Sequence, residues 1–290
     1  GNFKSQPAPK IVTALASLGG GTDGRIVAIS AGGIHSAALT RGGTMYTWGD
    51  ASYGQLGQGV EAVGEKLVAR PAPLVWQRVR QNSSGDLAAD IVGEGGRHRP
   101  KLVHISCGGQ HSAAVSDDGR VFCWGRADSG QLGLDRTWID FLEDRPTLSA
   151  REDGSPKSMA MKSGKMQGLE VPVEVTHLPP PGDDPAVSVA CGAFHTLAVL
   201  RSGRCFSWGN EEYGMLGLGR SRGWKAGVSA PREVTATGLG SAGGPYREGL
   251  GRRVAEVAAG GWHSAFLTAH GSLMTTGRGE YGRLGHGDEK

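Results

Sequence analysis

The chain has 290 residues, a formal net charge of +3, a hydrophobic fraction of 38% and 50 glycines. The mild charge gives weak support to a nucleic-acid binder, and no apolar run reaches the ~18 residues of a membrane span, so no membrane partner is predicted. Because glycine is far above its usual ~7% while the apolar fraction still allows a core, we predict many tight turns.

The first predicted strand is the phrase PAPKIV at Pro7–Val12. A stronger series follows: an apolar β-branched stretch at 24–30, an alternating stretch at 35–40, and a second alternating stretch at 43–49. The short link before the last of these contains Gly43, where a hairpin needs a positive φ. A fourth strand is predicted to start at a proline, as at Pro73, Pro172 and Pro231.

This series recurs four times. The aligned histidines are followed after thirteen positions by Trp or Thr, and after nineteen by Gly within YGQLG, SGQLG, YGMLG or YGRLG. Four antiparallel strands in tandem copies predict the blades of an all-β propeller, with loop insertions at 136–170, 78–101 and 235–253. The repeats lie near 24–59, 101–135, 185–219 and 253–287.

The GG-x-H, WG and YGQLG phrases resemble the repeat of the regulator of chromosome condensation family (RCC1-type). The resemblance implies propellers that usually have seven blades, so four visible repeats predict part of a larger propeller. Open apolar blade faces would then favour self-association. Thr276, in the place of the repeated Trp, is interpreted as a cap at the end of the arc, and ring closure by the Pro7–Val12 strand stays an alternative.

The repeated aromatic and imidazole side chains are interpreted as structural, because no acid or cysteine stands at a fixed offset from the histidines. These histidines are expected to bond loop carbonyls, and the tryptophans to pack. The structural set is His35, His111, His195, His263, Trp48, Trp124 and Trp208.

No metal ligand set, cofactor or catalytic residue is predicted. The cysteines lack C-x-x-C spacing and are interpreted as free buried thiols of an intracellular protein, cytoplasmic or nuclear.

Strand direction places the Gly-Gly-x-His links and the loops after QLG on one face, which we call the upper face. Its longest insertion carries apolar and acidic side chains that suit a partner-binding anchor, with a short helical turn folded on its own blade as the alternative. An acid also follows the repeat histidine by seventeen positions and suits a basic partner, unless it is only a solvated turn residue. The candidates are Trp138, Phe141, Asp140, Glu143, Asp144, Asp128, Glu212 and Glu280.

The opposite, lower face is predicted to be basic and could hold phosphate or an acidic tail; solvated arginines are the alternative. The candidates are Arg78, Arg80, Arg97, Arg99, Lys101, Arg120 and Arg204.

Architecture of this kind predicts a protein–protein interaction module without bond-making chemistry. The family resemblance implies a second hypothesis, guanine-nucleotide exchange on a Ran-like small GTPase, in which a blade insertion acts as a wedge. A third is association with chromatin, the nucleosome or nucleic acid.

Overall fold

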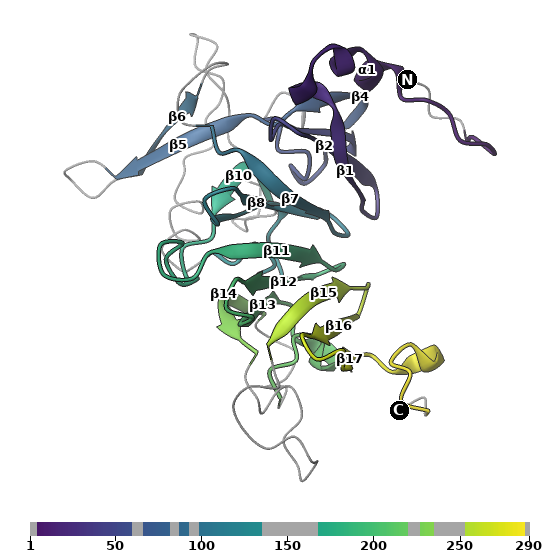
Figure 1. The fold of residues 1–290 in the computed structure, drawn as a ribbon, viewed down its shortest axis with the longest axis vertical. Helices are drawn as coiled ribbons and strands as arrows, with labels where there is room; N and C mark the ends of the chain where they lie inside the picture. Colours follow the sequence, from purple (N-terminus) through teal and green to yellow (C-terminus); the bar gives the residue numbers. More distant parts are fainter. Residues whose placement is uncertain are drawn as a thin grey trace.

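The computed structural model describes residues 5–59, 66–81, 87–92, 99–134, 168–219, 227–234 and 253–287. These residues are almost entirely β-structure. They form four antiparallel sheets that follow one another from one end of the molecule to the other, with the two chain termini at opposite ends in Figure 1.

Each sheet is one blade whose strands pair in chain order. The first blade contains β1 (Ile26–Ala31), β2 (His35–Thr40), β3 (Met45–Asp50) and β4 (Leu67–Pro73). The second contains β7 (Leu102–Cys107), β8 (His111–Ser116), β9 (Val121–Arg126) and β10 (Gly168–Glu174). The third contains β11 (Ala186–Cys191), β12 (His195–Leu200), β13 (Cys205–Gly209) and β14 (Val228–Glu233). In the described part of the fourth, β15 (Val254–Ala259), β16 (His263–Thr268) and β17 (Leu273–Gly277) pair.

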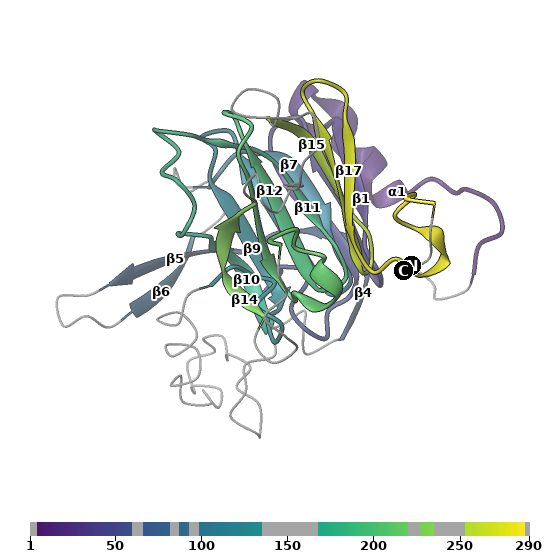
Figure 2. The same ribbon diagram turned by 90° about the horizontal axis from the view of Figure 1, so that it is seen from below.

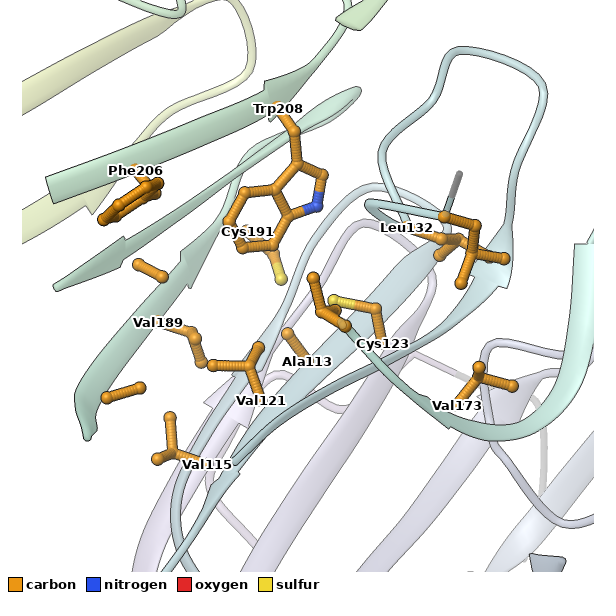
Figure 3. Close-up of a cluster of buried hydrophobic side chains, with 14 of the residues drawn as sticks. Ala113, Val115, Val121, Cys123, Leu132, Val173, Val189, Cys191, Phe206 and Trp208 are labelled. Carbon is orange, nitrogen blue, oxygen red and sulfur yellow. The ribbon is translucent and has the colours of Figure 1, made fainter. Parts of the chain in front are cut away.

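The apolar cores lie between the blades. One cluster joins the first and second blades, a second joins the second and third, and a third joins the third and fourth. Figure 3 shows the middle cluster, where Trp208 and Cys191 of the third blade face Val121 and Cys123 of the second. Since the second and third blades bury both faces against their neighbours, their middle strands are buried along almost their whole length instead of alternating.

Serine side chains tie the innermost strands together across these contacts between neighbouring blades, which we call the seams. The backbone N–H of Cys107 donates to Ser30 Oγ at 2.9 Å, and that of Cys191 donates to Ser106 Oγ at 2.9 Å. The same bond at the same repeat position sets the register of one blade on the next.

The prolines of the outer strands do not start them, contrary to the sequence expectation. Pro73 ends β4, while Pro172 and Pro231 lie inside β10 and β14 at interruptions of the pairing register. These strands are the outer edges of their sheets, and an irregular edge strand tolerates a residue that lacks an N–H donor.

The N-terminal segment is another departure. Pro7–Val12 forms no strand; it leads into the short helix α1 (Thr13–Ala16) and the 3₁₀ turns η1 (Ser17–Gly20) and η2 (Thr22–Gly24). The expected strand that could close the ring is therefore wrong, and the four blades are an open arc, a partial propeller.

A β-hairpin lies in the link between the first two blades, where the sequence indicated only an insertion. It consists of β5 (Trp76–Gln81) and β6 (Leu87–Val92) and projects away from the sheets in Figure 2. Its base is anchored by the buried Trp76, whose ring meets that of Phe122 edge-on at 5.1 Å.

The two ends of the arc expose blade surfaces that are buried elsewhere at the seams between neighbouring blades. Ile29 on β1 is 80% exposed, whereas Ile105 and Val189 at the same repeat position are 7% and 3% exposed. The Trp of the repeat points toward the preceding blade, so the residue left at the open end is the half-buried Trp48. Thr276 instead faces the third blade, where its hydroxyl donates to the Gly214 carbonyl at 2.9 Å. The interpretation of Thr276 as a cap is therefore wrong.

Candidate protein-binding face

The upper face is built by one backbone contact that recurs in each blade. The N–H fifteen positions after the repeat histidine donates to the carbonyl just before that histidine, at 2.9 Å in all four blades. This contact sets two variable side chains beside each other at the end of the second and third strands. The pairs are Asp50 with Ile34, Arg126 with Gln110, Asn210 with Phe194, and Arg278 with Trp262.

The repeat histidines lie beneath this face and connect each blade to the next. His111 Nε2 lies 2.9 Å from Thr196 Oγ1, and that hydroxyl donates to the Gln131 carbonyl at 2.8 Å. The same relay runs from His35 through Ser112 and from His195 through Ser264. The direct partner is therefore a hydroxyl of the following blade, and the carbonyl expected from sequence is one bond further.

This relay fixes the protonation of the histidines. Since the hydroxyl hydrogen is used for the carbonyl, the imidazole must donate from Nε2, which makes it the neutral Nε2–H tautomer. Burial lowers the pKa of His35 to about 4, that of His111 to about 3 and that of His195 to about 4. A neutral, buried donor suits a structural role.

The imidazole of the repeat histidine explains why the first position of the GG-x-H phrase is a glycine. A Cβ on Gly192 would lie 2.2 Å from Cε1 of His195, so any side chain there would displace the imidazole. The glycine of the WG phrase meets a second limit, because Gly125 has a φ of 98° and a Cβ there would approach the His111 Cα to 2.7 Å.

The repeated tryptophans also bond across the seams. Trp124 Nε1 donates to the Gln55 carbonyl at 3.0 Å, and Trp208 Nε1 donates to the Gln131 carbonyl at 2.9 Å. Each carbonyl thus accepts both a hydroxyl and an indole from the following blade. Both side chains are fully buried, and their bonds also position the loop above them.

Above the relay, Arg126 fills a slot formed by three blades. Its guanidinium lies over the Tyr53 ring of the first blade at 5.1 Å and over the Phe194 ring of the third at 5.5 Å. It also bonds Asp128, at 2.9 Å from Nε and 2.6 Å from the terminal nitrogen, and the Gln110 amide oxygen at 2.6 Å. Asp128, a predicted partner-binding acid, is therefore paired with a cation of its own blade. Its hydrogen bonds to the guanidinium raise the pKa of Arg126.

The fourth blade repeats this arrangement. Arg278 lies over the Tyr213 ring at 5.1 Å and pairs with Glu280 at 2.5 Å. Trp262 packs against Phe194 at 5.0 Å and meets Tyr213 edge-on at 6.0 Å. The result is a continuous belt across all four blades, which we call the aromatic–arginine belt: Tyr53, Arg126, Phe194, Trp262, Tyr213 and Arg278.

Glu212 differs from the other two predicted acids. The residue two positions before it is Asn210, whose side chain accepts the Glu212 N–H at 2.7 Å and supplies no charge. The carboxylate of Glu212 bonds the Tyr213 phenol and raises the pKa of that phenol. Within the described residues, no guanidinium pairs with Glu212.

The remaining candidate residues are not brought together as one site. The insertion with Trp138, Asp140, Phe141, Glu143 and Asp144 lies outside the described residues. On the lower face, Arg120 pairs with Asp118 at 2.8 Å, and Arg204 holds Glu233 through two bonds at 3.0 and 2.6 Å. Arg99 and Lys101 lie just before β7, Arg78 and Arg80 are in β5, and Arg97 is outside the described residues. Arg120 and Arg204 are thus paired with carboxylates of their own blades.

The cysteines and acids of the described residues build no metal centre. Cys107, Cys123, Cys191 and Cys205 are free and buried. Burial raises the pKa of Cys107 to about 11 and that of Cys205 to about 12, so these thiols stay protonated. No three metal-binding side chains gather anywhere in the described ranges, nor is any helix there long and apolar enough to cross a membrane.

The belt itself was missed by sequence reasoning. Its arginines and aromatic residues stand at the variable positions of the repeat, fifteen after and one before the histidine. Comparing what differs among the copies, in addition to what is shared, would have brought these positions together.

Comparison with known proteins agrees with this architecture. The chain is 31% identical over 259 residues to the mitochondrial RCC1 domain-containing protein RUG3 of Arabidopsis thaliana, covering 89% of this chain and 43% of that protein. It is 29% identical to the Arabidopsis ultraviolet-B receptor UVR8 (99% and 48%) and 31% identical to human E3 ubiquitin-protein ligase HERC2 (98% and 4%). The chain therefore spans under half the length of these relatives.

Solved structures share the fold. Prp20p of Saccharomyces cerevisiae aligns with a TM-score of 0.57 at 21% identity, covering 91% of this chain and 48% of that one. Human WBSCR16 aligns with a TM-score of 0.52 at 23% identity, covering 88% and 47%. The RCC1-like domain profile matches residues 1–290, and the chain belongs to the RCC1-like domain family.

Proposed function

We propose that this chain is a protein–protein interaction module that binds its partners through the upper face. The observation that carries the proposal is the aromatic–arginine belt. Trp, Tyr and Arg are the residues that dominate binding energy at interfaces, and here they are held rigid by stacking and ion pairs. A preorganised surface loses less side-chain entropy on binding.

Two arginines of the lower face support the same choice. Arg120 and Arg204 are engaged with carboxylates of their own blades, so neither offers an unpaired charge to a phosphate group. We propose an intracellular location, cytoplasmic or nuclear, because four buried free thiols fit a reducing compartment.

Site-specific photocrosslinking in cells tests the proposal. A photoreactive amino acid at Tyr281, which is 87% exposed on the upper face, is expected to capture a protein partner. The same amino acid at Asp117, in the lower-face turn between β8 and β9, is the matched control. Equal capture from both positions, or capture from Asp117 alone, would contradict an upper-face module.

Guanine-nucleotide exchange on a Ran-like GTPase is the second candidate. It is favoured by the likeness to Prp20p, whose structure is described together with its binding to Gsp1p and histones. If this candidate is correct, micromolar protein accelerates release of labelled GDP from Ran, and substituting alanine for Trp138 and Phe141 in the insertion removes the effect. Release at the background rate excludes exchange by this chain.

Chromatin association is the third candidate. Salt-dependent capture of nucleosomes or DNA by the purified chain would support it, and photocrosslinking to protein at Tyr281 without such capture would favour the module.

A further inference from the structure

The loops after the third strand of the second, third and fourth blades share one arrangement of side chains on the upper face. It is complete in the second and fourth blades and incomplete in the third. In the second and fourth blades, an arginine fifteen positions after the repeat histidine pairs with an acid two positions further on and lies over an aromatic ring of the preceding blade. We infer that the third blade takes the missing guanidinium from a partner protein, and so binds an arginine side chain between Glu212 and Trp262. This inference rests on the proposed function.

The acid of this slot is present, and among the described residues no guanidinium pairs with it. Glu212 stands where Asp128 and Glu280 stand, but Asn210 replaces the arginine. Asn210 accepts the Glu212 N–H at 2.7 Å, so it keeps the shape of the loop while adding no charge. The carboxylate bonds the Tyr213 phenol, and its remaining acceptor positions suit the two parallel N–H groups of a guanidinium.

The aromatic wall of the slot is also present. Arg126 of the second blade lies over the ring of Phe194, which belongs to the third blade, at 5.5 Å. At the third blade, the equivalent residue of the following blade is Trp262, the best of the aromatic side chains for stacking a cation. Its ring is held by Phe194 and Tyr213 at 5.0 and 6.0 Å.

The opposite wall is smaller than in the other slots. Tyr53 closes the rear of the Arg126 slot and Tyr213 that of the Arg278 slot. The residue of the second blade at this position is Ser129, whose hydroxyl bonds Asp128 at 3.3 Å. A side chain arriving from outside therefore meets an acid and an aromatic ring, with a serine where the other slots have a phenol.

The occupant is an arginine of a protein segment and not a lysine or a phosphate. The chain itself uses arginine at both filled positions. Both guanidinium groups lie over an aromatic ring and pair with a carboxylate, and that of Arg126 forms paired bonds to Asp128. An ammonium cannot combine planar stacking with paired bonds. An anion would meet the Glu212 carboxylate at close range.

Fluorescence anisotropy with a labelled ten-residue peptide alternating arginine and glycine tests the inference on the 290-residue chain at low salt. The key variant is Asn210→Arg, which supplies the guanidinium from within the blade and is expected to weaken peptide binding more than tenfold. Glu212→Gln is expected to weaken it about fivefold, and Trp262→Ala about threefold. Thermal unfolding checks that each variant is folded.

Matched controls separate the slot from general electrostatics. Asp117→Asn removes an equal charge on the lower face and is expected to leave binding unchanged. A peptide with citrulline at each arginine position is expected to bind at least tenfold more weakly, and the lysine peptide about threefold more weakly. The inference is overturned if Asn210→Arg binds as the wild type does, or if Asp117→Asn and Glu212→Gln have equal effects.

Photocrosslinking at Tyr281 distinguishes failure of the arginine slot from failure of the proposed interaction module. Capture of a partner that persists unchanged in Asn210→Arg would reject the arginine slot and leave the interaction module standing. Loss of all capture at the upper face in the wild type would reject the module itself.

Discussion

The seam between the second and third blades and the rear face of the first blade use the same repeat positions in opposite surroundings. At the seam, Trp208 is fully buried and bonds a carbonyl of the preceding blade, and Val189 is 3% exposed. At the rear face, Trp48 is half-buried and Ile29 is 80% exposed. The burial and the hydrogen bonds of a repeat residue in this fold therefore depend on the blade that packs next to it.

The histidines extend the comparison to the front end of the arc. His111 is enclosed at a seam, whereas His263 is half-buried on the last described blade, where the described residues offer it no hydroxyl of a following blade.

Lowering the pH should have the largest effect on the free energy of unfolding. Burial lowers the pKa of three seam histidines to about 3 or 4, so the unfolded chain binds protons more tightly than the folded chain below about pH 6.5. The stability they contribute is complete above pH 6.5 and falls as the pH decreases toward 4, by roughly 1.4 kcal/mol per pH unit for each histidine. Urea unfolding between pH 7 and pH 4 measures the slope. His111→Gln should reduce it, and His263→Gln should reduce it less, because burial also lowers the pKa of the half-buried His263. Equal reductions would contradict the contrast.

Removal of a seam indole should come next. Trp208→Ala is expected to lower the free energy of unfolding by about 3–5 kcal/mol, because it leaves a cavity and removes a donor from the Gln131 carbonyl. Trp48→Ala, at the open face, is expected to cost about 1 kcal/mol. Denaturant titrations at low protein concentration provide the values, and similar losses for the two variants would mean that the rear face is covered in solution.

A hydroxyl of the relay should matter less. Thr196→Val keeps the volume but leaves the His111 Nε2–H without an acceptor, which is expected to cost about 1–3 kcal/mol. The control is Ser36→Ala at the same repeat position of the first blade, where a change within about 0.5 kcal/mol is expected. A large loss in Ser36→Ala would show that another histidine reaches this position.

The smallest effect on stability is expected from Ile29→Asp, yet this variant tests the open face most directly. Exposed apolar blade faces predict self-association, so light scattering at tens of micromolar should show a mass above 30.1 kDa for the wild type. The aspartate should shift the chain toward the monomer without changing its thermal unfolding at high dilution. A monomeric wild type would contradict the prediction.

The four blades could be predicted from the repeats of the sequence. The His, Trp-Gly and YGQLG phrases recur at a fixed spacing because each is required by the local geometry of a blade. Examples are the hairpin with a positive φ at Gly43, the close approach of Gly192 to its histidine, and the alternating strands. Such needs are met within one blade or one seam, so they leave a periodic record in the chain. The all-β class, the structural histidines and the buried thiols were predicted for this reason.

Which residues meet between blades depends on how the blades stack. The sequence could not indicate that Trp48 and not Thr276 faces the open end, because the direction in which a blade packs is not encoded in its own periodicity. Nor could it show that Arg126 joins Tyr53 and Phe194, residues that are distant in the chain and belong to three different blades. Side chains at variable positions acquire partners only when the blades stack, and the upper face of this protein is composed of such positions.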